Sequence, residues 1–184
     1  MEYIRIPKER IGVLIGKDGW VKKEIEERLG VKIEIDKEGM VIIEKTERAA
    51  DVLAEWKARD IVKAIARGIN PDIALKLARD DYFLEVIDLT EIVGRSRKAL
   101  IRQKGRIIGT KGKTRRFIEE KTGATLSVYG KSVAIVGKAE ELQYAKEAVI
   151  MLAEGSPHGV VYRFLERKAK ELKKGKFSLW ESKS

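Results

Sequence analysis

The sequence predicts an α+β protein made of two tandem copies of one small module. The first reason is an internal repeat, because a shift of 93 residues aligns 11–19 with 104–112 without a gap and Gly30 with Gly123. The second reason is that strand-like alternation and helix-like periodicity follow one another in the same order in both copies. The length of 184 residues has room for two small domains, and a hydrophobic fraction of 43% is typical of a packed core.

Each copy is expected to run strand, helix, helix, strand, strand, helix, which gives a three-stranded antiparallel sheet with three helices on one face. In the first copy, Pro7 stands where a helix typically starts and Gly30 where one typically stops. The elements predicted there are a strand at 3–6, a helix from Pro7, a helix at 20–29, strands at 31–36 and 40–44, and a long helix at 49–67.

The second copy repeats this order, with a residue near Ser96 opening its first helix and Gly123 ending its second. The elements predicted there are a strand at 82–87, a helix from about Ser96, a helix at 114–122, strands at 125–129 and 133–136, and a long helix at 139–154, followed by a basic helix at 162–174. The predicted domains are a first module at 1–69, a linker with a short helix at 70–81, a second module at 82–158, and a basic C-terminal helix and tail at 159–184.

The net charge of +10 lies in the second half of the chain. Residues 82–184 hold 22 of the 39 Lys and Arg residues but only 12 of the 29 Asp and Glu residues. The densest stretch, 92–118, has no acid and ten basic residues: Arg95, Arg97, Lys98, Arg102, Lys104, Arg106, Lys111, Lys113, Arg115 and Arg116. A charged fraction of 37% with one Asn is typical of heat-adapted (thermophilic) proteins, but their surfaces mix both signs. The run therefore predicts a site for a polyanion, with nucleic acid as the leading candidate.

Several classes of function are disfavoured. The chain has no Cys, which excludes disulfides, thiolate catalysis and cysteine-ligated metals. No run is long and apolar enough for a membrane span or a signal peptide, so a cytoplasmic location is expected. The single histidine, His158, is expected to be a solvated or turn-stabilising residue without triad or metal partners, so we expect no enzyme activity, metal or cofactor. A nucleotide-binding P-loop ending at Lys113 would need a glycine where Ile107 stands.

A Gly-x-x-Gly loop separates the first two predicted helices of each copy. The runs from Ile15 to Gly19 and from Ile108 to Gly112, in this setting, resemble the loop of the eukaryotic-type (type I) KH domain. Glycines let the backbone approach a ligand closely, and the helix that follows begins with free amide groups, which suit a phosphate. The resemblance implies that the loop clamps the backbone of about four nucleotides of single-stranded RNA.

The two loops differ in the charge between their glycines. The first loop has Lys17 and Asp18 between its glycines, so a carboxylate faces the phosphate. The second loop has Thr110 and Lys111 there, and further cations follow it in the sequence. We therefore predict that the second loop is the main RNA site, and that the first copy is a weaker RNA site, a protein-contact site or a scaffold. The predicted main-site residues are Ile108, Gly109, Thr110, Lys111, Gly112, Lys113, Arg115, Arg116, Arg106 and Leu126, and the secondary residues are Ile15, Gly16, Lys17, Asp18 and Gly19.

The KH resemblance also implies an apolar groove that receives bases beside each loop. The groove would be formed by Ile15 with Ile33 in the first copy, and by Ile108 with Leu126 in the second. Plain core packing explains the same four side chains equally well, so both readings stay open at this point.

A further segment narrows the resemblance to one family. The run from Leu152 to Tyr162, with its Gly-Ser-Pro turn, and the loop at 108–114 are together similar to the PNO (partner of NOB) family of two-KH proteins, of the archaeal type because Gly16 and Gly19 are intact. The resemblance implies binding of small-subunit ribosomal RNA near its 3′ end, and help in rRNA processing and small-subunit biogenesis. It also implies two protein partners, a PIN-domain rRNA endonuclease and an rRNA dimethyltransferase. The alternatives are a general KH adaptor for messenger RNA or RNA decay, and a protein-interaction scaffold.

If the cations of 92–118 contact phosphates, the affinity for RNA falls steeply with salt. Each neutralised phosphate of a single strand lowers the slope of log affinity against log salt by about 0.7, because condensed counterions are released. We expect at least about a tenfold loss of RNA affinity between about 50 and 200 mM salt, measured by fluorescence anisotropy. A flat salt titration would argue against phosphate contacts.

Overall fold

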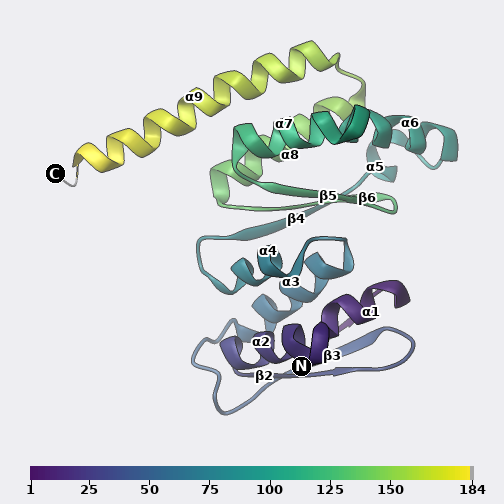
Figure 1. Ribbon diagram of the computed structural model, residues 1–184, viewed down its shortest axis with the longest axis vertical. Helices are drawn as coiled ribbons and strands as arrows, with labels where there is room; N and C mark the ends of the chain where they lie inside the picture. The colour runs from purple at the N-terminus through teal and green to yellow at the C-terminus, as the bar shows by residue number, and fades with distance from the viewer. Residues whose placement is uncertain (183–184) are drawn as a thin grey trace. The chain divides into compact units, whose positions relative to one another are not determined.

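The chain divides into two units, Met1–Leu84 and Glu85–Ser184, in a computed structural model that describes residues 1–182 (Figure 1). Positions 183 and 184, the end of the predicted C-terminal tail, lie outside the described residues. Each unit contains the predicted order of strand, helix, helix, strand, strand, helix, with the helices on one face of a three-stranded sheet, as Figure 1 shows. The predicted fold class is therefore confirmed.

The first unit is built on the sheet β1-β3-β2, whose antiparallel register pairs Ile4 with Val41 and Ile33 with Ile43. Ile33, Val41 and Ile43 are buried under the helices, because alternate residues of a strand face the same side. The elements are β1 (Glu2–Arg5), α1 (Lys8–Ile15), the one-turn helix η1 (Lys17–Gly19), α2 (Trp20–Leu29), β2 (Val31–Ile35), β3 (Met40–Lys45), α3 (Ala54–Ala66), α4 (Pro71–Ala74) and η2 (Leu75–Ala78).

The helix α3 begins at Ala54, later than the predicted start at residue 49. The carboxylate of Asp51 accepts a hydrogen bond from the Leu53 amide at 2.8 Å, and the Thr46 hydroxyl accepts one from the Arg48 amide at 3.2 Å. These side chains hold the segment before α3 in turns, because short polar side chains compete with the helix for backbone partners.

The segment predicted as a linker, 70–81, packs onto the first unit. Asn70 caps α4 by accepting from the amide two residues further on, at 2.9 Å. Leu75 and Leu77 of η2 are each 3% exposed, and η2 packs against α3. Lys57 of α3 binds the carboxylate of Asp80 at 2.6 Å. The division between the compact units falls inside β4, and the domain boundaries at 69, 81 and 158 stay predictions.

The second unit repeats the plan on the sheet β4-β6-β5, whose central strand is buried at every position. The short helix α5 was not predicted, and it forms because the Asp88 carboxylate accepts from the Thr90 amide and hydroxyl, at 2.9 and 2.6 Å. The elements are β4 (Phe83–Asp88), α5 (Thr90–Val93), α6 (Arg97–Ile108), the one-turn helix η3 (Thr110–Gly112), α7 (Lys113–Thr122), β5 (Thr125–Tyr129), β6 (Ser132–Gly137), α8 (Ala139–Glu154) and α9 (His158–Ser182).

The C-terminal helix α9 is longer than predicted at both ends. It packs on α7 and α8 through Val161 and Leu165, which are fully buried. Gly175 lies inside the helix, since one exposed glycine costs only about 1 kcal/mol relative to alanine. Phe177 and Trp180, beyond it, are exposed. No described helix, α9 included, is both long and apolar enough to cross a membrane.

The substitution Leu77→Ala should destabilise the first unit by about 2–4 kcal/mol, because it removes buried apolar volume from η2. Lys76→Ala, one residue earlier and exposed, is the matched control and should cost less than about 1 kcal/mol. The stability of both variants is measured by urea unfolding, with hydrogen exchange at the α3 amides as the readout. Equal, small effects would show that residues 70–81 are a linker with no part in the stability of the unit.

Candidate nucleic-acid interface

The two Gly-x-x-Gly loops have the same backbone conformation. Gly16 and Gly109 have φ/ψ values of 78°/173° and 75°/171°. Asp18 and Lys111, the next residues but one, both have φ of 55°, and they are the two non-glycine residues with positive φ among residues 1–182. The loop geometry therefore belongs to the repeated motif and does not depend on the charge between the glycines.

The first glycine of each loop is required by space as well as by backbone angle. A Cβ atom on Gly109 would lie 2.3 Å from Thr114 Oγ1, and one on Gly16 would lie 2.5 Å from Val21 Cγ2. The end of one helix thus touches the start of the next, and the loop between them is short and closed. The first amides of α2 and α7 have no partner inside their helices, so they are available to an anion at the loop.

The structure brings the centre of the predicted main site to one solvent-exposed surface. Thr110, Lys111 and Lys113 are exposed. Arg116 is exposed beside the loop, since a Cβ atom on Gly112 would lie 3.1 Å from its Nη1. The surface around the second loop therefore offers several cations together with backbone amides, which are the groups that hold a phosphodiester chain.

Two predicted main-site arginines make contacts with other residues of the same unit. The guanidinium group of Arg106 donates to the carbonyl oxygens of Leu152, at 2.6 Å, and Ser156. Arg115 pairs with Glu119 at 2.9 Å, one turn later on α7. Arg106 thus anchors the segment between α8 and α9 to the end of α6, and part of the charge of Arg115 is neutralised. Direct contact of either arginine with RNA stays a prediction.

The predicted groove residues divide into an exposed pair and a buried pair. Ile15 is 36% exposed and Ile108 is partly exposed, each directly before its loop. Ile33 and Leu126, 1% and 3% exposed, belong to the two cores. Core packing thus accounts for Ile33 and Leu126 on the strands, whereas Ile15 and Ile108 at the helix ends are accessible to a ligand.

The first loop carries an aromatic side chain that sequence reasoning missed. Trp20 follows the second glycine, is 46% exposed, and occupies the repeat position of Lys113. Asp18 is exposed between the glycines. The first loop therefore presents a carboxylate and an indole ring where the second presents cations, and the repeat alignment contained the signal that could have found Trp20.

The start of α9 is joined to the second loop, which was also missed. The hydroxyl of Tyr162 lies 3.1 Å from Thr114 Oγ1, and its ring centroid lies 4.3 Å from that of Phe117. His158 Nε2 donates to the carbonyl of Arg106 at 3.0 Å. His158 is half-buried at the start of a helix, whereas a residue within a turn was expected. The spacing of four residues between His158 and Tyr162, one helical turn, was the available signal.

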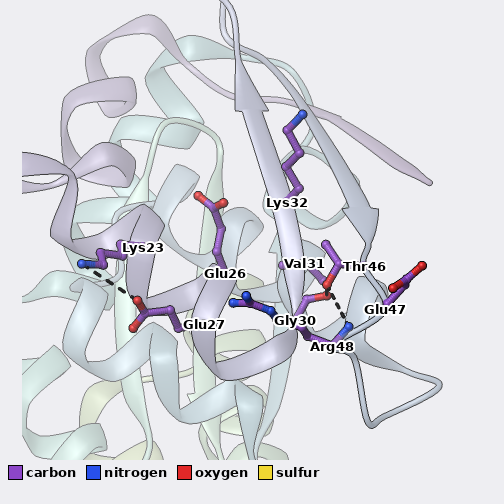
Figure 2. A pocket seen from close by; sticks show the side chains of 9 residues that line it. All are labelled: Lys23, Glu26, Glu27, Gly30, Val31, Lys32, Thr46, Glu47 and Arg48. Carbon is purple, nitrogen blue, oxygen red and sulfur yellow. Dashed lines mark hydrogen bonds and ion pairs between the residues drawn. The ribbon is translucent and has the colours of Figure 1, made fainter.

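A cavity of about 860 Å³ in the first unit is a competing candidate site (Figure 2). Figure 2 shows Lys23 of α2 beside Glu27, with which it pairs at 3.9 Å. Three carboxylates and three cations line the cavity, so its charge is balanced, and the carboxylates repel a polyanion. The lining residues are Lys23, Glu26, Glu27, Gly30, Val31, Lys32, Thr46, Glu47 and Arg48.

Shifted carboxyl groups occur at the start of α3. The N-terminal ammonium group donates to Glu55 at 2.9 Å and lowers the pKa of that carboxyl. The hydrogen bond from Lys57 lowers the pKa of Asp51, and burial raises the pKa of Asp60. These shifts come from ion pairs and packing that hold α3 in place. Among residues 1–182, no group of three His, Asp or Glu side chains is arranged to hold a metal ion.

Comparison with known families finds KH domains in both halves of the chain. Residues 83–170 match the eukaryotic-type (type I) KH domain in the form of the second KH domain of PNO1, and residues 1–55 match the KH domain family. The two matched segments contain both Gly-x-x-Gly loops.

Similar proteins share most of the chain. A KH domain-containing protein of Methanocaldococcus jannaschii is 56% identical over 100% of this chain and 81% of its own length. The RNA-binding protein PNO1 of Oryzias latipes is 32% identical over 88% of this chain and 68% of its own length. Fungal relatives are named pre-rRNA-processing protein PNO1. The a/eIF2alpha–aDim2p–rRNA complex of Pyrococcus horikoshii contains a chain that is 55% identical, with a TM-score of 0.86 over 92% of this chain and 94% of that one.

The substitution Tyr162→Phe should lower the free energy of unfolding of the second unit by about 1–2 kcal/mol, because it leaves the buried hydroxyl of Thr114 without its partner. Tyr144→Phe, on α8 of the same unit, is the control and should change it by less than about 0.5 kcal/mol. Urea denaturation of the two variants tests the contact. Equal losses would show that the Thr114–Tyr162 bond contributes nothing to stability.

Proposed function

Since this chain belongs to the PNO1 family of KH-domain proteins, we propose that it binds ribosomal RNA of the small subunit near the 3′ end and assists the maturation of that RNA and of the subunit. Its relatives support this role, because they are named as RNA-binding and pre-rRNA-processing proteins and one similar chain is part of a complex with rRNA. The RNA bound is single-stranded, as is usual for KH domains.

The observation that carries the proposal is the second loop. Its glycines place the backbone against the start of α7, and Lys111 and Lys113 stand exposed on it. The stretch 92–118 contains no acidic residue, so nothing in the loop or in α6 repels the approaching strand. Backbone amides and cations of this kind bind phosphates without regard to the base, so the loop supplies affinity and register.

The first unit binds RNA more weakly in this proposal. Its loop has the same shape, but Asp18 repels phosphate and Trp20 replaces a lysine. An exposed indole ring can stack on a base, and such stacking tolerates any sequence. The first unit then acts as a helper that holds a neighbouring stretch of the strand.

The proposal extends to partners, location and the absence of catalysis. The chain holds the 3′ end of the RNA in the cytoplasm while two other proteins act on it, a PIN-domain endonuclease and an rRNA dimethyltransferase. The second loop supports a binding role because amides and lysines grip a phosphodiester and supply neither a nucleophile nor a metal for cutting it.

Replacing Thr110 and Lys111 together by Asp should weaken RNA binding by about 10- to 100-fold, because two carboxylates then face the phosphate. The matched control is Lys17→Asp, which gives the first loop the same Asp-Asp pair and should cost less than about threefold. Aspartate suits the backbone at position 111, since Asp18 has the same φ of 55° at the matching position of the first loop. Fluorescence anisotropy with a single-stranded RNA measures the affinities, and thermal unfolding checks the fold.

Equal losses in the two loop variants would contradict the dominance of the second loop. The identity of the RNA is tested by crosslinking in cells followed by sequencing. We expect reads concentrated near the 3′ end of small-subunit rRNA. Reads scattered over messenger RNA would overturn the ribosomal role and favour the general adaptor.

A further inference from the structure

A pocket of about 350 Å³ lies beside the second loop. It lies where the end of α6, the loop, the first turn of α7 and the first turn of α9 meet. The described residues that line it include no acidic side chain. They are Arg102, Gly105, Arg106, Gly109, Thr110, Lys113, Thr114, His158 and Tyr162.

This pocket is separate from the groove that the KH resemblance implies. Neither Ile108 nor any residue of β5 lines it. Arg102 and Arg106 are one turn apart on α6, and both lie well around the helix from Ile108, since successive residues turn by about 100°. A strand held by the loop therefore meets the groove on one side of Gly109 and this pocket on the other.

The walls of the pocket are fixed by hydrogen bonds that involve four of its lining residues. Arg106 is held by two backbone carbonyls, and its own carbonyl accepts from His158. The hydroxyl of Tyr162 bonds with that of Thr114. The pocket is thus pre-formed, and a ligand does not pay to order these side chains.

The groups left for a ligand suit a sugar-phosphate unit. Arg102 and Lys113 are exposed cations on opposite helices, α6 and α7. Because the carbonyl of Arg106 can only accept, Nε2 of His158 carries a proton and donates it to that carbonyl. The other ring nitrogen, Nδ1, can then accept from a hydroxyl group, such as the 2′-hydroxyl of a ribose.

We propose that this pocket is an additional RNA subsite, which holds the sugar-phosphate of the nucleotide next to those gripped by the second loop. The start of α9 is then part of the RNA-binding surface, and the bound strand is longer than a single KH cleft holds. This inference rests on the proposed function, because it assumes that the second loop binds RNA. It assigns Arg102, Lys113 and His158 as contact residues and Arg106 as a positioning residue.

The test compares two lengths of one single-stranded RNA, about four nucleotides, which fill the cleft, and about eight, which pass beyond it. Arg102→Gln removes one cation from the pocket rim and, being exposed, leaves the fold intact. We expect this variant to lower the affinity for the longer RNA by about fivefold and the affinity for the shorter RNA by less than about twofold. The matched control, Arg97→Gln, removes the same charge from an exposed position on α6 that does not line the pocket, and should affect both lengths equally.

The variant His158→Ala is the second probe and should show the same dependence on RNA length as Arg102→Gln. Equal effects of Arg102→Gln on both lengths, or none, would overturn the subsite. The loop variant with Thr110 and Lys111 replaced by Asp separates this result from a failure of the proposed function. If the loop variant binds neither RNA while Arg102→Gln binds both as tightly as the unmodified protein, only the subsite is wrong. If the unmodified protein binds neither RNA, both proposals are wrong.

Discussion

The close approach of two successive helices at the first glycine of each loop is the constraint on which the site depends. Gly109 leaves no room for a side chain because Thr114 fills that space, and Gly16 stands in the same relation to Val21. This contact sets the short loop, directs the second glycine into the next helix, and leaves the first amides of that helix to a ligand. In the second unit, Thr114 also forms a hydrogen bond with Tyr162 at the start of α9, so the loop is linked to that helix.

The proposed division of work between the two modules rests on one backbone conformation that carries two sets of side chains. Asp18 and Lys111 have the same φ, so the loops differ in charge and not in shape. In the proposed function, Coulombic attraction makes the second loop the stronger phosphate site, whereas the first loop, with the exposed Trp20 beside it, offers stacking in place of charge. Part of the excess of cations in the second half of the sequence is exposed at or beside the second loop, on Lys111, Lys113 and Arg116.

Local signals predicted the fold well, and long-range contacts were beyond them. Alternating apolar residues and glycine stops are read within a few positions, so the six-element order and most element bounds agreed with the structure. The start of α3 was wrong because side chains such as Asp51 hold the preceding segment in turns. The contacts of site residues that depend on packing between distant segments were not predicted. Arg106 binds a carbonyl 46 residues further along the chain, and no periodicity in α6 indicates that partner.

In the proposed function, the second loop binds the RNA backbone at lower RNA concentrations than the first loop does. Nuclear magnetic resonance tests it directly, by following the amide signals of 109–113 and 16–20 while a single-stranded RNA from the 3′ end of small-subunit rRNA is added. We expect the signals of 109–113 to shift at the lowest RNA concentrations and those of 16–20 to shift only at higher ones. Shifts that begin at 16–20, or that leave 109–113 unchanged, would contradict it.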